Sequence, residues 1–198
     1  MNYYYKFNIM MLVLISISFG ADTFQPATKS DLQTAVDLWI SDKSSAVTSH
    51  GEINTWDVSL ITDMSELFKQ KNTFNDDIGN WDVSNVTTMH QMFWGAKKFN
   101  QDIGSWKVSK VTSMEWTFND AEAFNQNIGG WDVSKVTNMQ GMFWSATLFN
   151  QDIGGWDVSS VTSFQKFMID LQYFNHDLSN WDVHNVTDMS FMFHQCPR

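Results

Sequence analysis

The chain has 198 residues and a formal net charge of −10, with 12 Lys and Arg against 22 Asp and Glu. Apolar residues make up 43% of it, which indicates a folded globular protein and excludes a disordered one. The acidic balance and the lack of any run of Lys or Arg argue against a nucleic acid or an anionic membrane as partner. A single cysteine, Cys196, excludes an internal disulfide framework and a cysteine-based zinc site.

Residues 1–21 have the features of a secretory signal peptide. Lys6 supplies a positive charge, Ile9 to Phe19 form an apolar stretch, and small residues lie near a cleavage point at Gly20 or Ala21. The stretch is shorter than the roughly 20 residues that a membrane-spanning helix needs. We therefore expect an exported chain, secreted or at the cell surface, with no membrane span after signal removal. An uncleaved anchor is the alternative.

Residues 22–55 are predicted to form a helical N-terminal cap and a connector. Ser30-Asp31-Leu32-Gln33 matches the pattern of a capping box, which typically begins a helix. Residues 41–55 are then a polar connector. Four apolar residues lie on one face of the predicted helix and would cover the first repeat: Leu32, Ala35, Val36 and Trp39.

The remainder, residues 56–198, repeats with a period of 25. The consensus unit is W-D-V-S-x-V-T-x-M-x-x-M-F-x-x-A-x-x-F-N-Q-D-I-G-x, with five full units over residues 56–180 and a sixth that stops after 18 residues. Such self-similarity is typical of a solenoid, in which each unit buries its apolar face against its neighbours. The first position of each unit is a tryptophan: Trp56, Trp81, Trp106, Trp131, Trp156 and Trp181.

Seven apolar columns run through these units. Six of them begin at Trp56, Val58, Ile61, Met64, Phe68 and Phe74, and a seventh, of Ile and Leu, begins at Ile78. Every replacement within a column is apolar for apolar, which a continuous stacked core requires. A cofactor-binding cluster is the alternative for so many aromatic and Met side chains. We expect a core and no cofactor.

Within a unit, I-G-x-W-D-V suits a short strand, and M-x-x-M-F-x-x-A has helical spacing. The expected fold is therefore α/β, with one short strand and one short helix per repeat and a parallel sheet built by stacking. The column of Thr that begins at Thr62 lies between core Val and core Met, so a turn or helix-start hydrogen bond is its expected role. An exposed Thr array that orders water, as in ice-binding solenoids, is the alternative.

Two further kinds of polar column accompany the core. The Asn column that begins at Asn75 is expected to bond from copy to copy and to satisfy loop backbone groups. The Asp columns that begin at Asp57 and Asp77 are expected to form Asx turns. Calcium is the alternative for these acids. The third unit has Lys107 and Asn127 in place of both acids, which would interrupt a ladder of calcium ions.

The unit F-N-Q-D-I-G-x-W-D-V-S-x-V-T-x-M-x-x-M-F-x-x-A resembles the repeat of BspA-like leucine-rich-repeat surface proteins. Cys196 occupies the column of Ala96, Ala121 and Ala146, where a related spirochaete-type repeat has a small cysteine. The resemblance spans residues 56–198. It implies a leucine-rich-repeat-like right-handed solenoid, exported or displayed on a surface, that works by protein binding and adhesion. It implies no particular ligand and no functional residues.

Residues that break the repeat are the candidates for binding. Trp94 and Trp144 share a column that is otherwise varied, so both are expected to be exposed, and Trp116 is an additional ring in the unit between them. Exposed aromatic rings bind sugars or hold a protein partner, whereas lateral packing over the predicted helices is the structural alternative. Asn85 and Asn185 lie in glycosylation sequons and would matter if the host is a eukaryote.

The sequence offers little evidence of catalytic or metal-binding residues. No catalytic motif occurs, and the histidines fall in different columns, so we expect no enzyme and no metal site. The histidines are His50, His90, His176, His184 and His194.

The expected function is binding or adhesion at the cell surface, with an extracellular protein or glycan as ligand. The last unit has no polar cap, and repeat stacks need one for solubility. The alternatives are therefore a structural component that self-associates through this last repeat, or a fragment of a longer repeat protein.

Overall fold

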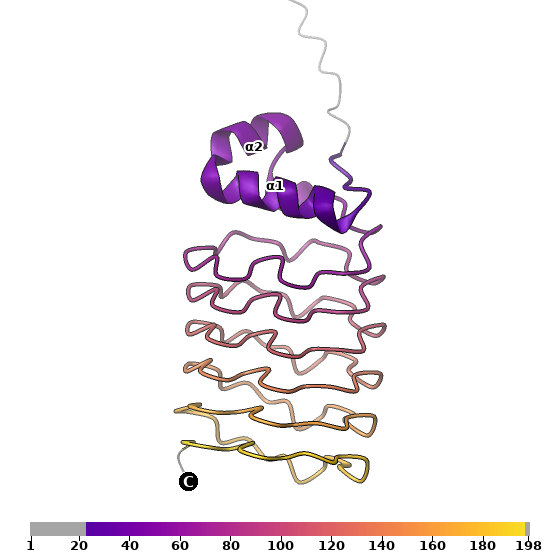
Figure 1. Cartoon of the computed structure of the whole chain (residues 1–198), viewed down its shortest axis with the longest axis vertical. Helices are drawn as coiled ribbons and strands as arrows, with labels where there is room; N and C mark the ends of the chain where they lie inside the picture. The colour runs from indigo at the N-terminus through magenta and orange to yellow at the C-terminus, as the bar shows by residue number, and fades with distance from the viewer. Residues whose placement is uncertain (1–22, 197–198) are drawn as a thin grey trace, which may run out of the picture.

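The computed structural model describes residues 23–196, so the predicted signal peptide of residues 1–21 lies outside the described residues. The repeats form six coils stacked along one axis, with two helices covering the N-terminal end (Figure 1). The six coils begin at the six tryptophans that mark the repeat. Within residues 23–196, no helix is long and apolar enough to cross a membrane.

The N-terminal end is formed by α1 (Lys29–Ser41), α2 (Lys43–His50) and the short 3-10 helix η1 (Ile53–Thr55). The N-cap of α1 is Thr28, two residues before the predicted Ser30. The Thr28 side chain accepts from the Asp31 N–H, and the Asp31 carboxylate accepts from the Thr28 N–H. The Trp39 ring meets the first-coil Trp56 edge-on at 5.8 Å between centroids, so α1 covers the first coil. The buried residues of α1 are Leu32, Ala35, Val36 and Trp39.

The predicted α/β fold is wrong. Across the described part of the repeats, residues 56–196, there is no sheet and no helix, so the leucine-rich-repeat-like solenoid with a parallel sheet does not describe this chain. Irregular backbone in consecutive turns forms each coil. Neighbouring coils share only isolated parallel bridges: Asp63 with Thr88, Thr88 with Ser113, Ser113 with Asn138, Asn138 with Ser163, and Ser163 with Asp188.

Left-handed backbone explains why the M-x-x-M-F-x-x-A segment is not helical. Two positions in each coil have positive φ, and the non-glycine residues there have φ between 56° and 63°. Such residues cannot continue a right-handed helix. Their N–H groups donate to the next coil instead, as Glu66 does to the carbonyl of His90 and Gln91 to that of Glu115, both at 2.9 Å. Bonds between coils have replaced bonds along a helix.

Asx turns explain why the I-G-x-W-D-V segment is not a strand. The Asp77 carboxylate accepts from the Gly79 N–H at 2.9 Å, and the Asp82 carboxylate accepts from the Ser84 N–H at 3.0 Å. Between them the Trp81 N–H donates to the Ile78 carbonyl. These local bonds occupy groups that a strand ladder would use. The Asx-turn interpretation of the acidic columns is confirmed, since Asn127 replaces Asp in the third coil and makes the same bond.

These acids predict that the stability of the fold depends on pH. Hydrogen bonds from the Ser134 and Ser159 hydroxyls, followed by those from the backbone N–H groups of the same serines, lower the pKa of Asp132 and Asp157 below 3.8. A depressed folded-state pKa stabilises the fold above the unfolded pKa, and this contribution is lost as the pH falls through the folded value. We therefore expect the thermal midpoint to be level near neutral pH and to fall below about pH 4.

Thermal melts between pH 6 and pH 2.5 measure this effect. An Asp157→Asn variant keeps the turn bond, as Asn127 does in the third coil, and removes one titrating group. Its midpoint should fall less steeply with acid than that of the parent chain. A midpoint that stays unchanged from pH 6 to pH 2.5 would contradict the prediction.

The apolar columns form the core, as predicted. Their members are buried throughout the first five coils, except Leu178, which is partly buried. The Phe68, Phe93 and Phe118 rings stack from coil to coil at 5.3 and 5.4 Å between centroids. The tryptophan column is held by hydrogen bonds as well, because each indole N–H from Trp81 onward donates to the backbone carbonyl of the residue 28 positions earlier in the chain. The donors are Trp81, Trp106, Trp131, Trp156 and Trp181.

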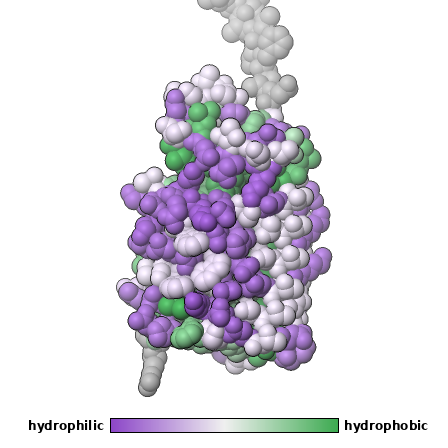
Figure 2. Space-filling view, in the orientation of Figure 1, coloured by the Kyte–Doolittle hydropathy of each residue, from purple (hydrophilic) through white to green (hydrophobic). Residues whose placement is uncertain are grey.

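The polar columns link the coils at the surface. The side-chain carbonyl of Asn75 accepts from the Asn100 N–H at 2.8 Å, so Asn residues do bond from coil to coil. The position of the Thr column between core residues suggested that it lies inside the molecule, and the structure shows that it does not. Thr62 and its counterparts are exposed, and the Thr87 hydroxyl donates to the Thr62 carbonyl at 3.0 Å. Figure 2 shows the outcome, since polar residues dominate the visible face of the coils.

Candidate binding surface

Three tryptophans that break the repeat lie side by side on consecutive coils. The Trp94 and Trp116 ring centroids are 6.3 Å apart with planes at 28°, and those of Trp116 and Trp144 are 5.7 Å apart at 43°. All three rings are half-buried, so the prediction that Trp94 and Trp144 are exposed needs correction. The predicted binding residues therefore do come together, and they do so by packing ring against ring across the coils. We call this surface the tryptophan row.

The row depends on two further departures from the repeat. Asn119 is the third-coil residue in the column of Trp94 and Trp144, and its small side chain leaves room between them that the Trp116 ring fills. On the next coil, a Cβ at Gly141 would lie 2.1 Å from Cε3 of Trp116, so only glycine permits this position of the ring. Sequence reasoning missed Asn119 and Gly141. The sequence signal for each was that it is a small residue in a column whose other members are larger.

A lysine lies at each end of the row. The Lys69 ammonium is 4.8 Å from the Trp94 centroid, and the Lys166 ammonium is 5.2 Å from the Trp144 centroid. Both distances are suitable for cation–π attraction. Lys69 is also bound to Gln91 Oε1 at 2.6 Å. The order across five coils is therefore lysine, three indoles, lysine.

The indole N–H groups distinguish the row from the core column. Each tryptophan of the core column donates its N–H to a backbone carbonyl. Among the described residues, the N–H groups of Trp94, Trp116 and Trp144 donate to no protein acceptor, and none of the three is a buried unpaired atom. These three donors therefore have some contact with solvent.

A pocket of about 430 Å³ lies over the row. Its polar lining comes from Gln91, Asn119, Asp120 and Ser145, residues that the sequence did not single out. Asp120 is paired with Lys97 at 3.5 Å, and the Ser145 hydroxyl donates to Asp170 at 3.1 Å. The pocket thus combines aromatic surface with hydrogen-bonding groups whose charges are already paired within the chain.

The other candidate positions show no site. The Asn85 and Asn185 side-chain amides each donate to a carbonyl of the preceding coil at 2.8 Å, so both are part of the inter-coil bonding, and their glycosylation stays a prediction. No group of three or more His, Cys, Asp or Glu in residues 23–196 is arranged to hold a metal ion. His184 pairs only with Asp182 of its own turn, at 2.7 Å.

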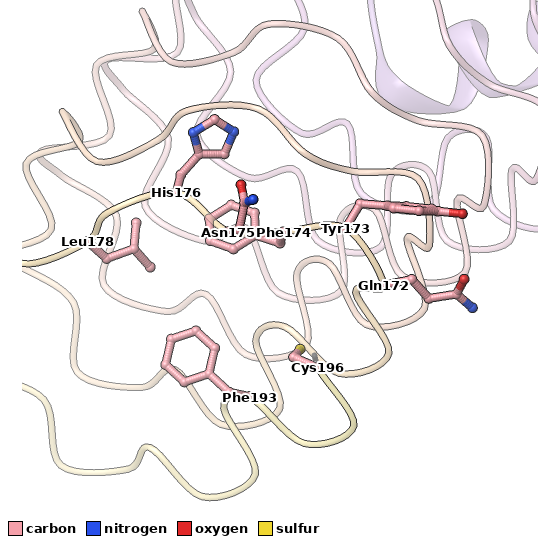
Figure 3. A pocket seen from close by; sticks show the side chains of 8 residues that line it. All are labelled: Gln172, Tyr173, Phe174, Asn175, His176, Leu178, Phe193 and Cys196. Atoms are coloured by element: carbon pink, nitrogen blue, oxygen red, sulfur yellow. The ribbon is translucent and has the colours of Figure 1, made fainter. Parts of the chain in front are cut away.

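The last described coil presents a second hollow, of about 840 Å³ (Figure 3). Phe193 and Cys196 lie on this coil, while Phe174 and Leu178 belong to the coil before it. The exposed apolar residues of the last coil are Val183, Met189, Phe191 and Phe193.

Fold and surface together define a coil-stacked repeat protein with an aromatic surface row and no recognisable reaction centre in the described residues. Residues 39–147 and 114–198 match a family described as Mycoplasma protein of unknown function, DUF285. The chain belongs to that family. No curated protein and no solved structure matches it.

Proposed function

We propose that the chain is an exported repeat scaffold that binds an extracellular protein or glycan at the cell surface. The observation that carries this proposal is the tryptophan row, where Trp94, Trp116 and Trp144 present three unbonded indole N–H groups over a pocket. Trp is strongly enriched at binding hot spots because it combines a large apolar surface with a polar tip.

Two sequence features support the location. Residues 1–21 resemble a secretory signal, and the repeat resembles that of BspA-like surface proteins. We propose that the chain groups with those proteins in function, as a binding or adhesion module rather than an enzyme. The resemblance is one of repeat sequence, and the tryptophan row adds a physical reason to expect binding.

Binding of the full chain to an array of matrix proteins and polysaccharides tests the proposal. We expect at least one ligand to bind, and a Trp94→Ala/Trp144→Ala variant to lose about tenfold or more in affinity. Leu60→Ala is the matched control, because Leu60 is an exposed apolar residue outside the row. A ligand that binds the double variant as tightly as the parent chain would place the site elsewhere.

Self-association through the last coil is the alternative, and light scattering on the same samples tests it. A monomer with a ligand agrees with the binding proposal. Large assemblies without any ligand would favour a structural component instead.

A further inference from the structure

We propose that the tryptophan row binds a neutral polysaccharide strand lying along the axis of the coil stack. This inference rests on the proposed binding function and names the class of its ligand. The row draws one ring from each of three consecutive coils, so its long direction follows the stack. An extended chain of repeating units matches that shape better than a single small molecule does.

The hydrogen-bonding groups of the pocket suit a ligand rich in hydroxyl groups. Trp94, Trp116 and Trp144 offer N–H donors, the Gln91 amide and the Ser145 hydroxyl both donate and accept, and Asp120 accepts. Sugar hydroxyls also donate and accept, so they can bond to all of these. The faces of the three indoles lie toward one another and toward Lys69 and Lys166, so the apolar surface that they offer to the C–H groups of a sugar is that of their ring edges.

The charges disfavour an ionic ligand of either sign. Lys69 is held by Glu66 and Gln91 at one end, and Lys166 lies over the Trp144 ring at the other. Asp120 is paired with Lys97. No lysine or arginine is among the residues that line the pocket, so an acidic glycan could reach only Lys166 at the end of the row, and a basic peptide would have to displace Lys97 from Asp120.

The backbone disfavours an extended peptide. Along the row, the Gln91 N–H donates to the Glu115 carbonyl, and the Trp116 N–H donates to the Gln140 carbonyl. The Trp144 carbonyl accepts from both the Asp120 N–H and the Asn119 side chain. Peptides that add to a protein surface as a strand need free main-chain groups, and here those groups already join coil to coil.

Titration of the full chain with soluble glycans, followed by tryptophan fluorescence and calorimetry, tests the inference. The neutral probes are a cello-oligosaccharide series, amylose, laminarin and mannan, and the acidic probes are hyaluronan and heparin. We expect a neutral glycan to bind, with an affinity that rises from disaccharide to hexasaccharide and changes less than twofold between 50 mM and 500 mM salt. Salt independence is expected because no ion pair is formed.

Variants distinguish a role of the tryptophan row in binding from a general effect on folding. Trp116→Ala should weaken binding about tenfold or more, and Trp116→Phe, which keeps a ring but removes the N–H, should lose less. Leu60→Ala should bind as the parent does, and thermal melts should show that the variants are folded.

Each outcome is decisive. If an acidic glycan or a matrix protein binds through Trp94 and Trp144 while no neutral glycan binds, the polysaccharide inference fails and the proposed binding function stands. If no probe of any class binds, both fail. If a neutral glycan binds equally well to the folded Trp116→Ala variant, the row is not its site.

Discussion

Replacing Phe118 by alanine is expected to lower the free energy of unfolding by about 3–5 kcal/mol. Phe118 is fully buried in the third coil, and its ring stacks on Phe93 at 5.4 Å and on Phe143 at 5.8 Å. It also packs against Phe124 of its own coil at 4.0 Å. The neighbouring rings cannot collapse into the gap, because each is held in its own column, so the cavity remains. Urea unfolding monitored by tryptophan fluorescence measures the loss.

The same substitution in the same column provides the control. Phe193 occupies the equivalent position in the last coil and is 52% exposed. Phe193→Ala should therefore change the free energy of unfolding by less than about 1 kcal/mol, since it removes little buried surface. Equal losses for Phe118→Ala and Phe193→Ala would contradict a core built by stacking of coils.

The substitution Gly129→Ala, which adds one methyl group, is expected to lower the free energy of unfolding by about 1–3 kcal/mol or more. A Cβ there would lie 2.4 Å from the carbonyl oxygen of Asp152 on the next coil. The obstacle is backbone rather than a side chain that can turn away, so the two coils must separate locally. The carbonyl also lies beside the Asx turn of Asp152, which fixes the chain at this point.

Gly130 is the matched control, because a Cβ there would meet nothing within 4 Å. We expect Gly130→Ala to leave the thermal midpoint unchanged or to raise it slightly through the unfolded state. The pair Gly154→Ala and Gly155→Ala repeats the comparison one coil further on, where the obstructing carbonyl belongs to Asp177. If Gly129→Ala and Gly130→Ala have the same thermal midpoint, the coils do not approach each other as closely as described.

The core could be predicted from the sequence because each column requires apolar residues independently of the other columns. A position such as that of Val58 meets its own equivalents in the next coil, Val83 and then Val108, so only apolar residues suit it. The stacking of Asn75 and its counterparts followed from the same reasoning. Periodicity thus predicts which residues meet, whatever the backbone between them does.

The backbone itself could not be predicted in this way. Met89, Met92 and Phe93 have the three-and-four spacing of a helix, yet they point into the core from a chain of turns with a left-handed residue at Gln91. Gln, Trp and Lys at such positions carry no signal for positive φ, unlike glycine. Asp77 and Asp82 did carry a signal for turns, which conflicts with the predicted strand between them.

The sequence predicted the aromatic rings of the candidate site but not the residues that make room for them. Trp94 and Trp144 stood out because their column is otherwise varied, and the structure brings Trp116 between them. The exposure of the rings was overestimated, since the room left by Asn119 and Gly141 depends on how the coils are stacked. No pattern along one unit reports on packing between three units.

The bonds from coil to coil also determine how the molecule responds to force. Each interior coil is held by neighbours on two sides, whereas the last described coil has a neighbour on one side only (Figure 1). A pull on the C-terminal end therefore loads one row of inter-coil bonds at a time. The chain should lengthen in steps as successive coils peel away. Each 25-residue coil would release roughly 80–90 Å of extended chain, and the helical end should detach last.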